Sequence, residues 1–386
     1  MSQMVLNRPS ATVSVGHLQV LLFTSAMLLV LGALLITSAS MDLAGAHYGN
    51  PFHFGLRQCI YIVIGIVAGL AVVNVPLSWW LRSGWLCLFM ALGILVLVLT
   101  PLGLTVNGST RWIPLGIINV QVSEVAKILL IAYMAGYVVR RREELINTWV
   151  GFFKPLAVLV VAAFLLVIQP DFGATVVIMT AAMGMIFLSG VRLSRFMPLI
   201  GLFTAAAVLL VVTQPYRLKR VVSYLDPWQD QFNTGYQLTQ SLIAFGRGEW
   251  TGVGLGNSVQ KLFYLPEAHT DFVFAIAAEE FGLIGSLAIL ATFTVLIWVS
   301  LRIARNAEKA GMAFGACFAY GLALLLALQA FINMGVNTGL LPTKGLTLPL
   351  VSYGGSSMIA SCVSIAILAR VEMERLDLLE HKGGDQ

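Results

Sequence analysis

The feature that most constrains this chain is a series of long apolar segments separated by shorter polar ones. Runs of about 17–25 predominantly apolar residues recur along the whole length, and each is long enough to cross the ~30 Å hydrocarbon core of a bilayer as a helix. The sequence is 58% hydrophobic and only 11% charged, whereas a typical soluble domain is about 25% charged. Runs of this length differ from the weak alternation of an outer-membrane barrel. The sequence therefore predicts an all-α polytopic membrane protein.

About ten transmembrane helices are expected from these runs. They lie near residues 18–38, 59–79, 84–104, 122–138, 156–169, 173–189, 196–213, 271–299, 313–334 and 353–369. The first run is longer than the core of a typical cleaved signal peptide, so we expect it to be retained. The chain then divides into an N-terminal tail over 1–17, a single membrane domain over 18–370 and a C-terminal tail over 371–386.

The basic residues are distributed unevenly between alternate loops. The positive-inside rule places both termini in the cytoplasm, because the short loops on that side then hold most of the Lys and Arg. The basic residues left on the outer side are Arg57, Arg111, Arg217, Lys219, Arg220, Arg247, Lys261 and Lys344. Most of these belong to one long loop, for which the rule has little force.

Three unusual connections fall on the predicted outer side. The first covers Pro101–Gln121, and the second, by far the longest, covers about 214–270 between spans 7 and 8. We expect the second to be ordered and partly helical, because it is rich in Trp, Tyr and Gly. The third, Gly335–Ser352, is apolar but broken by Gly and Pro. Such backbone persists at membrane depth only when it is buried in protein or lines a cavity.

Asp271 stands where the long outer loop enters an apolar run. A helix from Asp271 to Arg302 would be about 47 Å long, so Asp271 should lie near the outer headgroup level. Two interpretations remain open from the residues alone. The carboxylate could cap the helix or occupy its first turn, with Thr270 as an equally suitable cap. Alternatively, it could act as a partly desolvated general base at the membrane surface.

Four charged residues are predicted at greater depth, where ionised groups need partners. Glu279 and Glu280 would lie about 12–14 Å below Asp271. Glu124 and Lys127 form an (i, i+3) pair on the fourth span, although Lys127 could instead reach Glu279 or Glu280. We favour a structural ion network that joins spans four and eight over a catalytic role for these groups.

Other polar features have simpler interpretations. Lys344 is a lone cation in an apolar loop, which suggests an anion such as a phosphate. The glycine-rich segment Gly252–Ser258 lacks the strand–helix context of a phosphate loop, so we interpret it as a flexible or close-packing segment. His269 has no metal-ligand partners in the sequence, and Asp171 is expected to cap the turn into span six. The cysteines all fall in apolar runs and are interpreted as small apolar residues: Cys59, Cys87, Cys317 and Cys362.

Four segments resemble the SEDS family (shape, elongation, division and sporulation) of bacterial peptidoglycan glycosyltransferases. They are Asn107–Ile113, Gln169–Gly173, Pro266–Phe272 and Leu348–Ser357. The resemblance extends from the first span to the last. The segment Asn337–Gly345, with its lysine, is more similar to the cell-division branch of the family than to the rod-elongation branch.

The resemblance implies the SEDS fold with ten spans and an outer cavity that binds lipid II, an undecaprenyl-diphosphate-linked disaccharide pentapeptide. The essential acid of the family corresponds to Asp271. Suspected substrate or diphosphate contacts are Lys344, Arg111, Trp112, Lys261, Arg217, Glu267, His269 and Ser356. One departure is Phe263, where many division members have an acid, so a carboxylate role at that point is in doubt here.

The resemblance also implies a multi-pass protein of the bacterial cytoplasmic membrane, active on its outer face at the division septum. Expected partners are lipid II, a class B penicillin-binding transpeptidase, division regulators and membrane lipids, with no nucleic acid. No nucleotide motif is present; whether a divalent cation such as Mg or Mn is needed stays open. The alternatives are a lipid II flippase that uses Glu124, Lys127, Glu279 and Glu280, and a divisome scaffold without chemistry of its own.

Overall fold

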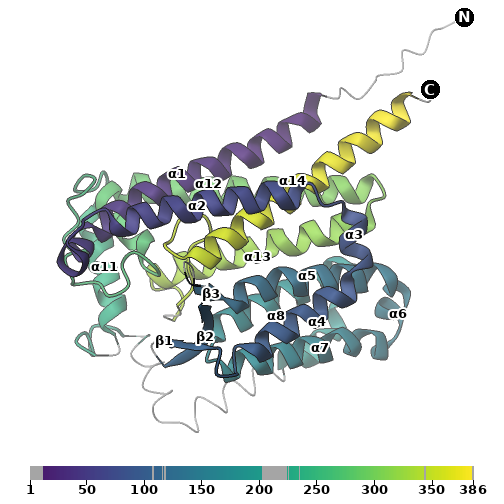
Figure 1. The fold of residues 1–386 in the computed structure, drawn as a ribbon, viewed down its shortest axis with the longest axis horizontal. Helices are drawn as coiled ribbons and strands as arrows, with labels where there is room; N and C mark the ends of the chain where they lie inside the picture. The colour runs from purple at the N-terminus through teal and green to yellow at the C-terminus, as the bar shows by residue number, and fades with distance from the viewer. Residues whose placement is uncertain are drawn as a thin grey trace, which may run out of the picture.

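The computed structural model describes residues 12–106, 108–114, 116, 119–201, 224, 226–233, 235–342 and 345–384. Helices dominate this part of the chain and run roughly side by side in one bundle (Figure 1). They are α1 (Thr12–Tyr48), α2 (His53–Val73), α3 (Leu77–Arg82), α4 (Gly84–Leu97), α5 (Val122–Arg140), α6 (Arg142–Asn147), α7 (Trp149–Ile168), α8 (Phe172–Leu188), the 3₁₀ helix η1 (Leu193–Arg195), α11 (Tyr236–Gly248), α12 (Val273–Lys309), α13 (Ala313–Asn337) and α14 (Gly355–Gly384).

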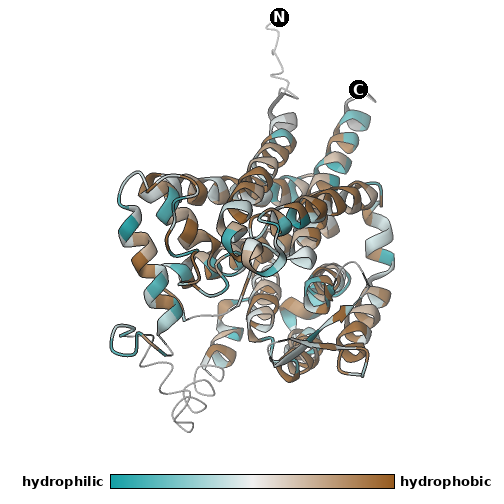
Figure 2. Ribbon diagram, turned by 60° about the vertical axis from the view of Figure 1, so that its left-hand side comes forward, coloured by the Kyte–Doolittle hydropathy of each residue, from teal (hydrophilic) through white to brown (hydrophobic). Residues whose placement is uncertain are grey.

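The apolar character of the bundle confirms the membrane prediction. Among the described residues, seven helices are long and apolar enough to cross a membrane, and α4 and α8 are shorter apolar helices. Apolar residues make up much of the helices (Figure 2), and large side chains such as Phe23, Phe89 and Phe164 are more than 60% exposed. Nine of the predicted spans thus have a matching helix, whereas most of the span predicted at 196–213 lies outside the described residues.

Several helices differ from their predicted bounds, and proline and glycine explain two of the differences. The second span was expected at 59–79, but α2 covers His53–Val73. It ends before Pro76 because a proline disfavours helical backbone in the residue that precedes it. The third span was expected to reach residue 104, but α4 ends at Leu97, ahead of Pro101 and Gly103 in the turn that follows.

The first unusual loop forms a small antiparallel sheet. Its strands are β1 (Leu104–Val106), β2 (Ser109–Pro114) and β3 (Asn119–Gln121), in the order β1-β2-β3. Trp112 pairs with Leu104 on one side and with Gln121 on the other. The sheet lies at one end of the bundle, near α11 and the start of α12, which we call the sheet end (Figure 1). The first residues of α1 and the last of α14 lie toward the opposite end (Figure 1).

The predicted continuous helix at 271–299 is instead broken. Within α12, Gly282 has φ 68° and ψ −163°, a conformation that is essentially restricted to glycine. The break separates a short half-helix, Val273–Phe281, from a long one, Leu283–Lys309. Because a break leaves helical N–H and C=O groups without their usual partners, those groups must find others.

A segment of the long loop supplies these partners. We call Glu249–Gly254 the strap. Its first two carbonyls, at Glu249 and Trp250, accept hydrogen bonds from the N–H groups of Leu283 and Ile284 at 2.9 and 3.1 Å. Its last two N–H groups donate to carbonyls on the other side of the break. These are Val253 to Glu279 and Gly254 to Glu280, both at 3.0 Å.

Gly252 lets the strap approach this closely. Its φ is +81°, and a Cβ atom there would lie 2.2 Å from the carbonyl oxygen of Glu280. The close-packing interpretation of Gly252–Ser258 is therefore confirmed. The part of the long loop that precedes the strap contains α11, which packs against α12, as expected for an ordered and partly helical loop.

Candidate active site

The backbone around Asp271 shows that its carboxylate is no helix cap. Helix α12 has Phe272 as its N-cap residue, with no side-chain capping hydrogen bond. The Asp271 carbonyl accepts hydrogen bonds from the side-chain amides of Asn333 and Asn337, each at 2.9 Å. Asp271 is therefore held by its backbone, and its carboxylate accepts no hydrogen bond from any residue that the structure describes.

The environment of this carboxylate favours its neutral form. Burial, and secondarily the negative charge of Glu267, raises the pKa of Asp271 to about 7, although Arg111 acts in the opposite direction. The side chain is still partly accessible. A Cβ atom on Gly345 would lie 3.0 Å from its Oδ2, so the carboxylate lies directly beside the loop that contains Lys344. Lys344 itself, like Arg217, lies outside the described residues.

The turn before Asp271 is organised by Glu267. This residue has φ +56°, and its carbonyl accepts hydrogen bonds from the N–H groups of Thr270, Asp271 and Phe272 at 3.1–3.3 Å. The Thr270 hydroxyl donates to the Glu267 carboxylate at 2.9 Å. Glu267 is exposed, so its charge reaches Asp271 from the open side of the site.

His269 forms part of an aromatic cluster. Its ring centroid lies 4.9 Å from that of Phe54 and 5.6 Å from that of Tyr353. Its carbonyl accepts a hydrogen bond from the Tyr353 N–H at 3.0 Å. Burial lowers the pKa of His269, against an opposite effect of Glu267, so the imidazole is neutral at pH 7. The cluster joins the Asp271 turn to the segment that leads into α14.

Arg111 and Trp112 come from β2, at the sheet end of the bundle. Both are half-buried. The Nε atom of Arg111 is buried and has no hydrogen-bond partner among the described residues. Arg111 is close enough to lower the pKa of Asp271, so the sheet brings a cation with unused donor capacity to this carboxylate.

Two suspected substrate contacts have structural partners instead. Lys261 is 7% exposed, and its Nζ lies 3.4 Å from Oε1 of Glu280 and 2.5 Å from the carbonyl of Gly256. The Ser356 hydroxyl accepts a hydrogen bond from the Gln121 N–H at 2.8 Å and donates to the Asn119 carbonyl at 3.2 Å. These contacts favour structural roles for both side chains, and any contact with substrate remains a prediction.

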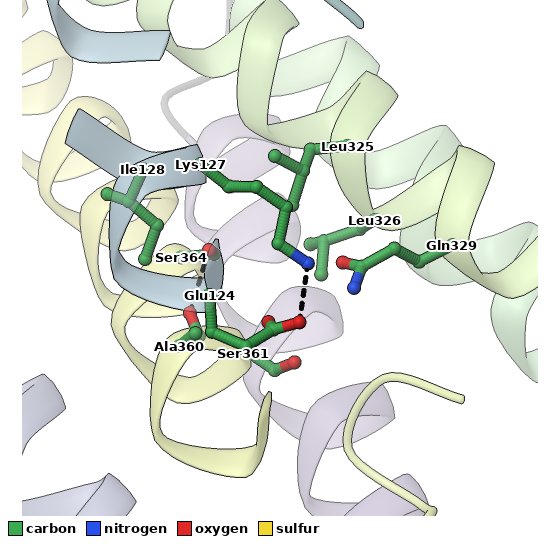
Figure 3. Close-up of a pocket in the computed structure, with 9 residues that line it drawn as sticks. All are labelled: Glu124, Lys127, Ile128, Leu325, Leu326, Gln329, Ala360, Ser361 and Ser364. Carbon is green, nitrogen blue, oxygen red and sulfur yellow. Dashed lines mark hydrogen bonds and ion pairs between the residues drawn. The ribbon is translucent and has the colours of Figure 1, made fainter. Parts of the chain in front are cut away.

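The predicted pair of Glu124 and Lys127 is present in the core of the bundle. Lys127 Nζ lies 2.7 Å from Oε1 of Glu124, and both side chains are buried. Helices α13 and α14 contribute the rest of the crevice around the pair, and the amide of Gln329 points toward it (Figure 3). The Nε2 atom of Gln329 has no hydrogen-bond partner among the described residues.

The expectation of one network between spans four and eight needs correction. The Glu279 carboxylate accepts hydrogen bonds from the Ser258 hydroxyl and from the N–H groups of the next two residues in the chain, Val259 and Gln260. The Nε atom of Arg247 lies 3.7 Å from Oε1 of Glu279. Glu280 accepts from the Ser38 hydroxyl at 2.6 Å and from the Gly256 N–H at 3.0 Å. The four groups thus form separate sets, because the break in α12 lets the long loop supply the partners of the two glutamates.

Asn333 and Asn337 were missed in the sequence. They lie four residues apart in α13 and therefore share one face of that helix. Both are fully buried. The available signal was a pair of amides at helical spacing inside an apolar run, next to a predicted functional loop. Asp171 behaves as expected, since its carboxylate caps α8 by accepting from the Ala174 N–H at 3.2 Å.

The described residues contain no group of three or more His, Cys, Asp or Glu that could hold a metal ion. A requirement for Mg or Mn therefore stays open. The cysteines are all free, in agreement with their interpretation as apolar residues.

Comparison with known proteins decides the family. Residues 19–376 match the cell cycle protein family of FtsW, RodA and SpoVE. The chain belongs to this family. Family membership agrees with the resemblance to SEDS proteins and, together with the apolar helices, identifies a multi-pass protein of the inner membrane.

Relatives and solved structures of the FtsW/RodA/SpoVE family extend this result. The chain is 70% identical over 365 residues to a "probable peptidoglycan glycosyltransferase FtsW" of Marinobacter nauticus. This match covers 94% of this chain and 92% of the relative. A protein of the same description from Hahella chejuensis is 58% identical, covering 92% of this chain and 89% of the relative.

Two solved structures share the fold. The first, from work described as "Structural coordination of polymerization and crosslinking by a peptidoglycan synthase complex", has a TM-score of 0.73 and 26% identity, and covers 92% of this chain and 97% of its own. The second is the Rod shape determining protein RodA of Thermus thermophilus. Its TM-score is 0.67 at 25% identity, covering 92% of this chain and 96% of its own.

Proposed function

We propose that this protein is a peptidoglycan glycosyltransferase that polymerises lipid II into β-1,4-linked glycan strands at the division septum, with Asp271 as the general base. The observation that carries the proposal is the Asp271 carboxylate. It is half-buried and free of hydrogen bonds within the described residues, and it has a pKa raised to about 7.

In this reaction the 4-hydroxyl of an acceptor lipid II attacks the anomeric carbon of the growing glycan, which is joined to a lipid diphosphate. A new glycosidic C–O bond forms as the bond to the diphosphate breaks. The proton of the attacking hydroxyl passes to Asp271, and the diphosphate leaves with the bonding electron pair. In-line displacement converts the α-linked phosphate into a β linkage.

A base with a pKa near the working pH suits this step, because it combines a useful fraction of the ionised form with sufficient basicity. Burial and Glu267 raise the pKa of Asp271, whereas Arg111 limits the rise. Arg111 has a second role in the proposal. The half-buried Arg111 guanidinium would donate to the departing diphosphate, since catalysis benefits from cations placed where negative charge develops. Lys344 adjoins Gly345 in the sequence and is the other candidate for this role.

We further propose that the sheet end of the bundle faces outward and that both termini are cytoplasmic. The distribution of basic residues supports this orientation. The basic residues at 140–142 lie at the end of α5 that is distant from the sheet. A class B penicillin-binding transpeptidase and division regulators are the proposed protein partners. The cited synthase complex, described as coordinating polymerization and crosslinking, supports a partnership with a crosslinking enzyme.

The flippase alternative relied on the deep charged residues. Each of these is engaged: Glu124 with Lys127, Glu280 with Lys261, and Glu279 with hydroxyl and backbone donors. Because their contacts are structural, they favour the enzymatic function over transport through the bundle.

The decisive test compares wild-type protein with Asp271→Asn in a purified polymerisation assay on lipid II, with the transpeptidase partner present. Loss of a general base should reduce the rate by about 10²–10⁴-fold, with normal yield of folded protein. Glu143→Gln, an exposed position on α6, serves as the matched control and should polymerise normally. Near wild-type polymerisation by Asp271→Asn would disprove the base assignment. Transport of lipid II across vesicles by wild-type protein that makes no glycan would instead support the flippase.

A further inference from the structure

The start of α12 contains an inserted side-chain amide. In a regular helix the Asp271 carbonyl would accept a hydrogen bond from the Ala275 N–H, four residues later. Here the carboxamide of Asn337 lies between the two groups. Its Nδ2 donates to the Asp271 carbonyl at 2.9 Å, and its Oδ1 accepts from the Ala275 N–H at 3.0 Å. One side chain therefore replaces the backbone hydrogen bond that would have drawn Asp271 into the helix.

Asn333 strengthens this arrangement from the preceding turn of α13. Its Nδ2 donates to the same Asp271 carbonyl at 2.9 Å and to the Leu346 carbonyl at 2.6 Å. Asn333 thus joins the backbone of Asp271 to the loop whose Gly345 lies against the carboxylate. The Nδ2 atom of Asn337 also donates to the backbone carbonyl of Asn333 at 2.8 Å, so the two residues form one connected unit.

The surroundings make the unit rigid. Both asparagines are 1% exposed or less. The backbone carbonyl of Asn337 accepts a hydrogen bond from the Ser241 hydroxyl of α11 at 2.7 Å. Both amide atoms of Asn337 are paired, so its side chain keeps one orientation, because a flipped amide would set like groups against each other. Asn333 is held through its Nδ2 donors, and its Oδ1 has no hydrogen-bond partner among the described residues.

We propose that Asn337 and Asn333 are positioning residues for Asp271. They keep it one residue ahead of Phe272, the N-cap of α12, and thereby aim its carboxylate at the reacting hydroxyl. This inference rests on the proposed function, because it assigns a task to the asparagines only if Asp271 takes part in the reaction. Without the Asn337 amide, nothing lies between the Asp271 carbonyl and the Ala275 N–H, and the contacts that remain are those of Asn333 with the carbonyl and of the Phe272 carbonyl with the N–H. The helix would then extend toward its N-terminus and move the carboxylate.

The test measures kcat and KM for lipid II, per folded protein, in Asn337→Ala and Asn333→Ala. A displacement of about 1 Å in a reacting group can cost as much as 10²-fold in rate. We expect kcat to fall by at least about tenfold in Asn337→Ala and by less in Asn333→Ala, which leaves the inserted amide in place. KM should stay within about threefold, because neither buried side chain touches substrate.

Thr338→Ala is the matched control. Thr338 follows Asn337 in the chain, and among the described residues its hydroxyl bonds only to carbonyls of α13, at Met334 and Gly335. It should keep wild-type kcat and KM. If Asn337→Ala does not fold, Asn333→Ala carries the test alone, with a fall in kcat at constant KM as the expected result.

The outcomes separate this inference from the proposed function. Wild-type kcat in folded Asn337→Ala and Asn333→Ala, alongside an inactive Asp271→Asn, would overturn the positioning role only. Full activity of Asp271→Asn would overturn the proposed function, whatever the asparagine variants do. A reduced yield of folded protein with unchanged kcat would show that the asparagines serve stability alone, and would also overturn the inference.

Discussion

Two sites on the same helix hold carboxylates in opposite ways. At the start of α12, the Asp271 carboxylate accepts no hydrogen bond from the described residues, and its pKa is raised to about 7. Two turns later, Glu279 and Glu280 are at most 1% exposed. Hydroxyl and backbone donors of α1 and of the long loop bind both oxygens of Glu279 and the Oε1 atom of Glu280.

The difference lies in which acceptor the neighbouring hydrogen-bond donors bind. At Asp271 the available amides of Asn333 and Asn337 bind the backbone carbonyl and leave the carboxylate free for another molecule. At Glu279 and Glu280 the donors bind the carboxylates themselves, which joins the long loop to the break at Gly282. A carboxylate without partners suits chemistry, whereas a carboxylate bound by donors from other segments suits structure. In Glu280 those donors all bind Oε1, and the buried Oε2 has no partner among the described residues.

The largest effect should come from closing the space where the strap crosses the break. In Gly252→Ala the new Cβ would meet the Glu280 carbonyl at 2.2 Å, in a backbone with φ +81°. We expect a loss of about 3 kcal/mol or more in stability and little folded protein, as measured by monodisperse yield in detergent. Gly256→Ala is the matched control, since Gly256 has φ +86° but open space around it, and should lose only about 1 kcal/mol.

A smaller effect on folding is expected from Glu279→Gln. The new amide would place N–H donors against donors that now bind a carboxylate, at a cost of about 1–3 kcal/mol. Folded yield should fall several-fold while the rate per folded molecule stays within about twofold. Thermal unfolding in detergent and the polymerisation assay measure the two quantities. Normal yield together with abolished turnover would mean that the two sites are less distinct than their contacts indicate.

The raised pKa of Asp271 predicts a pH dependence. A general base must be ionised, and its ionised fraction increases as the pH passes upward through the pKa, which is about 7. The rate should therefore be about tenfold lower at pH 6 than at its plateau above pH 8, if the rate follows this fraction. Glu279→Gln serves as the control, because its profile should have the same midpoint. A flat profile from pH 5 to 8 would contradict the assignment.

The smallest effect concerns Arg111. Its positive charge lowers the pKa of Asp271, so Arg111→Gln should move the midpoint of the pH profile slightly upward. The plateau rate should also fall if Arg111 contacts the diphosphate. Arg302→Gln removes a cation that lies against Trp298 in the long half-helix of α12, and should change neither quantity. A downward shift in Arg111→Gln would show that Arg111 does not act on Asp271 as described.

Much of the fold followed from the apolar runs, because the length of a span depends on bilayer thickness and the composition of a short window. The bounds of α2 and α4 were less accurate, since Pro76, Pro101 and Gly103 ended or displaced helices that hydropathy alone would extend. The sheet β1–β3 was not predicted. Its strands are only three to six residues long, and β3 is joined to α14 by the contact between Gln121 and Ser356, which lie far apart in the sequence.

For the site, the sequence placed Asp271, Arg111 and the Gly345 loop at one end of the bundle. It suggested Lys261 as a substrate contact, which stays a prediction, and the structure places that ammonium in a buried position beside Glu280. The missing information was the break at Gly282, which brings the long loop to the two glutamates. Asn333 and Asn337 were overlooked because a buried amide inside an apolar run has no functional signature until its partners are known.

The sequence by itself determined the membrane-spanning helices and the acid at the entry to α12, because both depend on local composition and on the cost of placing charge in a bilayer. Only the tertiary structure decided which carboxylates accept hydrogen bonds from the described residues and which do not. That depends on hydrogen-bond donors from segments distant in the chain: α13 for Asp271, and the loop before α12 for Glu279 and Glu280. Hydrogen bonds act over about 3 Å, so the distinction exists only once the chain is packed.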